Sequence, residues 1–90
     1  MQYEKEIRLG EPRLGITVAD GNWTFKIPYR LKVRQDEKTG VVYLVSRKGT
    51  TFKLSSDGKN VFIMLYDQWF IFYPMLKISW LRHMLGVKHD

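Results

Sequence analysis

Basic and apolar residues alternate along one central stretch of the 90-residue chain. Between 23 and 34 the odd positions are apolar or aromatic, and four of the even positions are cations. Successive residues of a β-strand point to opposite faces, so these cations share one face and can follow the phosphates of a nucleic-acid backbone. A tyrosine on the next stretch can stack on an unpaired base. The predicted nucleic-acid-binding residues are Lys26, Arg30, Lys32, Arg34, Tyr43, Arg47 and Lys48.

The charge balance of the chain favours the same kind of partner. Fifteen Lys and Arg residues against nine Asp and Glu residues give a formal net charge of +6. Seven of these cations and only two of the acidic residues fall within 21–48. Such a segment suits a polyanion or the acidic face of a protein. Alternating cations also keep an edge strand soluble and unpaired, so the pattern has a purely structural interpretation as well.

Patterns that could support catalysis or metal binding are incomplete. Gly10, Gly15 and Thr17 have the spacing of a phosphate-binding loop, but Ile16 stands where that loop requires lysine. Two turn glycines around a proline are the better interpretation. His83 and His89 lack cysteine or further histidine ligands, and no serine has an adjacent base. We therefore expect no catalytic residue, no metal, no cofactor and no enzymatic activity.

Hydrophobic periodicity and turn residues divide the chain into short strands and one helix. Pro28, inside the longest strand, indicates an edge position or a bulge, because proline cannot donate to the ladder. A loop over 36–39 joins this strand to the next one and places Arg34 opposite Val41 and Lys32 opposite Tyr43. The predicted strands cover 3–9, 14–19, 23–34, 41–47, 51–54, 61–66 and 69–73.

The C-terminal part supplies the helix. Pro74 suits the first turn of a helix over 75–85, and Gly86 suits its C-terminal cap. Trp80 and Leu81 lie on the broad apolar arc that should pack on the sheet. The strands over 61–73 are apolar on both faces and need covering on both sides, by the helix, by further strands or by a second copy of the chain. A homodimer is therefore possible.

The expected fold class is α+β. It is mainly an antiparallel sheet of five to seven short strands, curled or barrel-like, with one C-terminal α-helix. We expect a single domain over 1–90, with an N-terminal hairpin over 1–22, an antiparallel sheet over 23–73 and the helix over 75–85. The absence of cysteine and of an apolar leader favours a cytoplasmic protein. Charges and a proline interrupt the most apolar stretch, so no membrane span is expected.

These features predict a small basic protein that is not an enzyme and binds nucleic acid, with single strands favoured, through phosphate contacts of the 23–48 hairpin. The alternative is a protein-binding regulator or inhibitor. It would dock the basic hairpin or an exposed sheet edge on an acidic partner protein.

Overall fold

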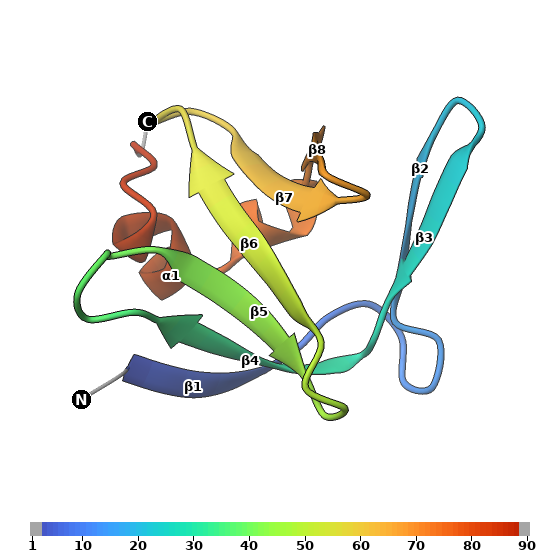
Figure 1. Ribbon diagram of the computed structural model, residues 1–90, viewed down its shortest axis with the longest axis horizontal. Coiled ribbons are helices and arrows are strands. Elements are labelled where there is room, and N and C mark those ends of the chain that lie inside the picture. Colours follow the sequence, from blue (N-terminus) through green and yellow to red (C-terminus); the bar gives the residue numbers. More distant parts are fainter. Residues whose placement is uncertain (1–2, 89–90) are drawn as a thin grey trace.

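The computed structural model describes residues 3–88, which form two antiparallel sheets followed by a short helical segment (Figure 1). The helical segment consists of a 3-10 turn, η1 (Tyr73–Lys77), and one α-helix, α1 (Ser79–Met84). The strands are β1 (Tyr3–Arg8), β2 (Ile16–Asp20), β3 (Trp23–Ile27), β4 (Arg30–Gln35), β5 (Val42–Ser46), β6 (Thr51–Ser56), β7 (Val61–Leu65) and β8 (Gln68–Ile71).

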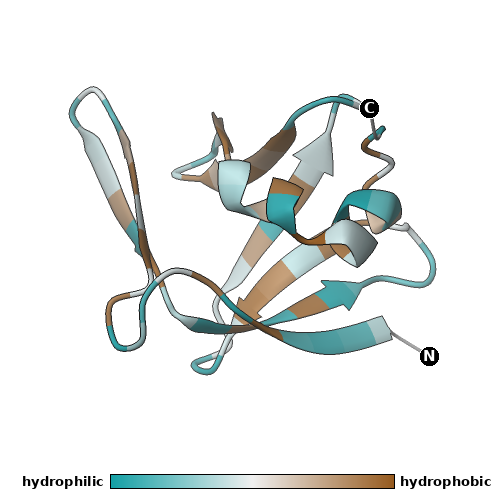
Figure 2. Cartoon of the chain, turned by 180° about the vertical axis from the view of Figure 1, so that it is seen from behind, coloured by the Kyte–Doolittle hydropathy of each residue, from teal (hydrophilic) through white to brown (hydrophobic). Residues whose placement is uncertain are grey.

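The main sheet has six strands in the order β1-β4-β5-β6-β7-β8 and curls without closing. Its inner face carries the core, and η1 and α1 cover that face (Figure 2). Leu31, Val33, Leu44 and Ile63 point inward and are almost fully buried, whereas Lys32, the strand neighbour of Leu31 and Val33, is exposed. This alternation is the period-2 pattern of a strand with one covered face.

Strands β2 and β3 form a separate hairpin, called the arm below, that extends beyond the main sheet (Figure 1). Aromatic contacts hold the arm against the sheet. The ring of Phe25 lies 5.6 Å from that of Phe52 and 5.3 Å from that of Tyr66, edge-on in both cases. The ring of Trp23 lies 4.7 Å from that of Tyr66 with the two planes tilted by 40°, and the Tyr66 hydroxyl donates to the carbonyl oxygen of Thr24. Edge-to-face ring pairs at such distances are favourable contacts.

The fold class predicted from the sequence is confirmed: the chain is mainly antiparallel β with a C-terminal helix. Residues 3–88 contain eight strands rather than five to seven, because the stretch 23–34 is not one strand. It breaks at Pro28 and Tyr29 into β3, which pairs with β2, and β4, which pairs with β1 and β5. The prediction of an N-terminal hairpin over 1–22 is therefore wrong, and so is that of one continuous 23–48 hairpin. Proline's missing donor explains the break.

The register between β4 and β5 differs from the predicted one by two residues. Arg34 faces Tyr43, and Lys32 faces Val45. The amide of Asp36 donates to the carbonyl of Val41, so the loop begins one residue later and ends one residue later than expected. A shift by an even number leaves every side chain on its predicted face. The cations of β4 accordingly lie on the outer face, as the alternation indicates.

The helix predicted over 75–85 is shorter and interrupted. Ile78 is extended, with φ −104° and ψ 101°, and separates η1 from α1. Leu81 is fully buried, as expected. Trp80 is only half-buried and lies at the border of the core. The Lys5 ammonium is 4.5 Å from the centroid of its ring. Within residues 3–88, no helix has the length and apolarity needed to span a membrane.

Candidate nucleic-acid interface

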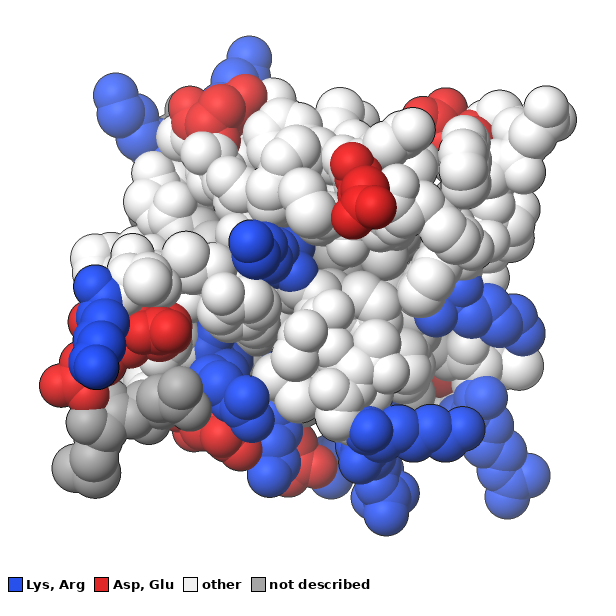
Figure 3. Space-filling model, viewed as in Figure 1, with Lys and Arg blue, Asp and Glu red and all other residues white. Residues whose placement is uncertain are grey.

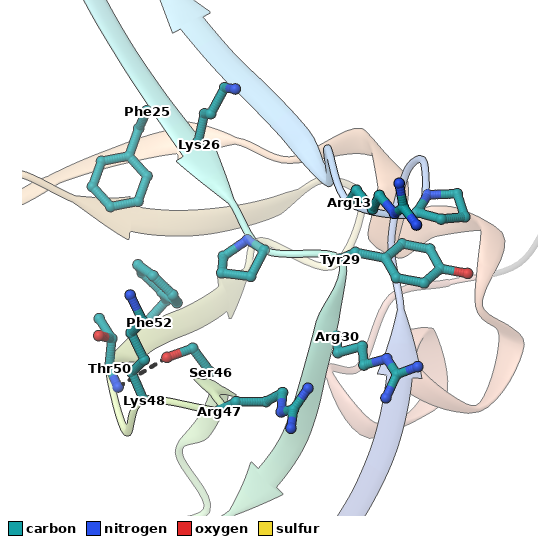
Figure 4. A pocket seen from close by; sticks show the side chains of 12 residues that line it. Arg13, Phe25, Lys26, Tyr29, Arg30, Ser46, Arg47, Lys48, Thr50 and Phe52 are labelled. Carbon is teal, nitrogen blue, oxygen red and sulfur yellow. Dashed lines mark hydrogen bonds between the residues drawn. The ribbon is translucent and has the colours of Figure 1, made fainter.

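A hollow of about 630 Å³ lies at the foot of the arm, where β3, β4 and the β5–β6 turn meet (Figure 4). Its floor is largely apolar, and its rim carries five cations. None of the described residues that line it is acidic. The lining residues are Pro12, Arg13, Phe25, Lys26, Pro28, Tyr29, Arg30, Ser46, Arg47, Lys48, Thr50 and Phe52.

The loop between β1 and β2, which covers residues 9–15 and is called the N-terminal loop below, brings Arg13 to this hollow. The loop closes on itself as the amide of Gly15 donates to the carbonyl of Glu11, and it is tied to the arm's foot by a bond from the amide of Leu9 to the carbonyl of Tyr29. Gly15 has φ +67°, and a Cβ there would collide with the carbonyl oxygen of Ile27. Glycine is therefore required for this close approach. The interpretation of Gly10 and Gly15 as turn glycines is confirmed, since both have positive φ.

The β5–β6 turn presents Arg47 and Lys48. The amide of Ser46 donates to the carbonyl of Thr50, and the amide of Gly49 donates to the carbonyl of Ser46. The Ser46 hydroxyl also accepts from the amide of Thr50, at 3.1 Å. These bonds fix the turn, so the two central side chains are exposed at the mouth of the hollow.

Lys26 and Arg30 complete the rim from the two sides of the break at Pro28. Within residues 3–88, none of the five rim cations forms an ion pair with a carboxylate, and all five are exposed. Figure 3 shows Lys and Arg side chains gathered at the lower right of the molecule, below the arm. Uncompensated charge on one surface produces the positive potential that attracts polyanions.

Lys32 and Arg34, both predicted to bind nucleic acid, lie farther along β4 beside Glu4 of β1. The Lys32 ammonium is 3.1 Å from one carboxylate oxygen of Glu4, and Nε of Arg34 is 3.5 Å from the other. The hydrogen bond from Lys32, with the nearby charge of Arg34, holds the pKa of the Glu4 carboxyl below its usual value. These two cations are therefore partly compensated, unlike those of the rim.

Tyr43, the predicted stacking residue, is also away from the hollow. It lies on β5 opposite Arg34 and Lys53, and it lines a separate depression with Met64 and Tyr66. The structure thus brings together four predicted residues, Lys26, Arg30, Arg47 and Lys48. It adds Arg13 and the rings of Phe25, Tyr29 and Phe52, which the sequence analysis did not include.

The two histidines were the remaining candidate metal ligands. His83 is exposed on α1, and His89 lies outside the described residues. Among residues 3–88, no three His, Cys, Asp or Glu side chains are grouped closely enough to hold a metal ion. In comparisons with protein-family models, curated proteins and solved structures, the chain matches none.

Proposed function

We propose that this chain binds single-stranded nucleic acid at the hollow below the arm. The observation that carries the proposal is one concave site that combines an apolar, aromatic floor with five cations that form no ion pair within residues 3–88. Sites for single strands combine these two elements, since cations track the phosphates and rings stack on the bases. The footprint is Arg13, Lys26, Arg30, Arg47 and Lys48, with Lys32 and Arg34 extending it along β4.

A single strand fits this site better than a duplex. The rings of the floor are recessed between the arm and the β5–β6 turn, and a base must leave its stack to reach them. A duplex keeps its base faces covered and offers phosphates alone, whereas an unpaired strand offers both.

The test of the function is the salt dependence of binding. A fluorescently labelled single strand should bind at low salt and weaken by roughly 10²–10³-fold between about 50 and 200 mM salt, the loss expected when about five phosphates are neutralised. A duplex of the same length should bind more weakly at each salt concentration. Fluorescence anisotropy measures both. Failure to bind any strand at low salt, or a flat salt response, would refute the proposal.

Protein binding at the β8 edge is a second candidate function, favoured by the contrast between the two edges of the main sheet. The β1 edge carries four charged residues, Glu4, Lys5, Glu6 and Arg8. The β8 edge has the sequence Gln-Trp-Phe-Ile and carries no charge. Cations and other charges protect natural edge strands from pairing, and β8 has no such protection. Its outer face is also apolar, with Trp69 and Ile71 46% and 47% exposed.

The occupant we propose for this edge is a second copy of β8. The amide of Phe72 donates to the carbonyl of Val61, so by alternation the backbone groups of Trp69 and Ile71 point away from β7. In an antiparallel pairing about a two-fold axis, each of these residues exchanges hydrogen bonds with the other residue of the second copy. No charged side chain of β8 opposes this pairing, and Trp and Ile form a favourable cross-strand pair.

Sedimentation velocity tests the pairing. The wild-type chain is expected to sediment as a dimer, and Trp69→Lys as a monomer, because lysine places a charge on the apolar face. Leu14→Lys adds the same charge at an exposed residue of the N-terminal loop and should leave the dimer intact. A wild-type chain that stays monomeric at its highest soluble concentration would contradict this assignment.

A further inference from the structure

We infer that the hollow receives one unstacked nucleobase while the rim cations hold the phosphates on either side of it. The inference rests on the proposed function and specifies how the strand is bound. Its starting point is the separation of polar and apolar groups within the site, with charge at the rim and rings in the floor.

The floor suits a planar aromatic group better than a phosphate. It is formed mainly by the rings of Pro12, Phe25, Pro28, Tyr29 and Phe52, and Phe52 is itself buried. A phosphate placed against these rings would give up hydration and receive no hydrogen bond from them, whereas at the rim it meets charged donors. An uncharged base loses little on entering and gains contact with the rings. The volume of about 630 Å³ lies within the range of small-ligand pockets.

The cations lie on opposite sides of the floor. Figure 4 shows Arg13 beside Tyr29 on one side and Lys48 near Phe52 on the other. A nucleotide joins an anionic phosphate to an aromatic base, and a strand has a phosphate on each side of every internal nucleoside. One inserted base therefore allows contacts with both flanking phosphates at the rim. A simple phosphate or an acidic peptide segment would leave the floor empty.

Little in the hollow can distinguish one base from another. Its uncharged polar side chains are Ser46, Thr50 and Tyr29. The Ser46 hydroxyl already accepts from the amide of Thr50, and the Tyr29 hydroxyl points away from Phe25 and Phe52 (Figure 4). Base identity is read by hydrogen bonds to base edges, whereas stacking accepts every base. The site is therefore expected to accept any of the four bases with similar affinity.

Phe25 and Tyr29 are the rings placed to contact the base. Phe25 is half-buried and held edge-on by Phe52 and Tyr66, so its position is fixed before the ligand arrives. Tyr29 is half-buried at the break between β3 and β4, and its backbone carbonyl accepts from the amide of Leu9. Tyr29→Leu is therefore the cleaner variant, because it removes the ring and keeps the backbone bond.

The experiment compares two strands of about six residues, within the site size of small single-strand-binding domains. One is oligothymidylate, and the other has the same phosphates and sugars but no bases. Wild-type protein should bind oligothymidylate roughly 5- to 150-fold more tightly, the factor expected for one stacked base. Tyr29→Leu should weaken binding of oligothymidylate and leave binding of the abasic strand unchanged. Tyr73→Leu, at an exposed ring of η1 that does not line the hollow, should change neither.

The possible outcomes distinguish a failure of base insertion from a failure of nucleic-acid binding itself. Equal, salt-dependent affinities of the wild-type protein for both strands would overturn base insertion and leave nucleic-acid binding in place. Binding of neither strand would overturn both. Thymidine monophosphate is expected to compete only at much higher concentration than the strand, because it has a single phosphate. Competition at equal concentration would make a free nucleotide the ligand and overturn the assignment to a strand. The wild-type comparison decides even if Tyr29→Leu fails to fold.

Discussion

Leu81→Ala is expected to lower the free energy of unfolding by about 2–5 kcal/mol, the range for Leu→Ala in a packed core. Leu81 is fully buried where α1 packs on the inner face of the main sheet. A domain of this size has only roughly 5–15 kcal/mol of stability in total. Thermal unfolding followed by circular dichroism should therefore show a fall in Tm of at least about 8 °C.

The control for this prediction is Leu14→Ala, which makes the same substitution at a side chain 58% exposed in the N-terminal loop. It should change stability by less than about half a kcal/mol, as exposed substitutions usually do. Equal melting temperatures for Leu81→Ala and the wild type would mean that α1 does not pack on the sheet as described.

Hydrophobic alternation was the most informative signal in the sequence. It assigned Leu31 and Val33 to the core and Lys32 to the outer face, and these assignments held although the register was two residues off. The face on which a side chain lies is predicted correctly despite a register error of two, because the side-chain period of a strand is two. Only a register shift by an odd number of residues reverses the faces. For the same reason the fold class could be predicted before the pairing of strands was known.

The pairing of β1, β2 and β3 could not be predicted, because it depends on one residue whose effect is ambiguous. Pro28 lies within an otherwise regular alternation, and proline is compatible with an edge strand, a bulge or a chain break. The structure has the break, which transfers β3 to the arm and leaves β4 in the main sheet. Nothing local to 1–22 indicates that β1 pairs with β4, a contact between distant parts of the chain.

Only part of the candidate site could be predicted from the sequence, for the same reason. Four of its cations belong to the basic segment and were singled out by their charge and by the alternation of the strands. Arg13 reaches the rim through a loop whose position depends on Gly15 packing against Ile27, a contact invisible in the sequence. Conversely, Lys32 and Arg34 resemble the other cations in sequence, and only the pairing of β1 with β4 places Glu4 beside them. Charge compensation is thus a property of the fold.

Reversing the charge at the β5–β6 turn, with Arg47→Glu and Lys48→Glu together, is expected to abolish much of the nucleic-acid affinity. Both side chains are exposed at the mouth of the hollow, so the fold should tolerate the change with a loss of about half a kcal/mol. Affinity for a single strand should fall at least about tenfold at low salt, whatever its sequence, because phosphate contacts carry no sequence information. The slope of log K against log salt should flatten by about two, one for each lost contact.

The matched control reverses Lys38 and Lys59, which are exposed in the β4–β5 and β6–β7 turns and do not line the hollow. Both double variants change the net charge equally, so long-range attraction weakens in both, and only the variant at the hollow loses direct contacts. The Lys38→Glu, Lys59→Glu protein should therefore keep most of its affinity and all of its salt slope. Equal losses in the two variants would make net charge the cause and remove the argument for a localised footprint. Wild-type affinity in the Arg47→Glu, Lys48→Glu protein would leave the basic rim without a role in binding and direct attention to the apolar edge at Trp69 and Ile71.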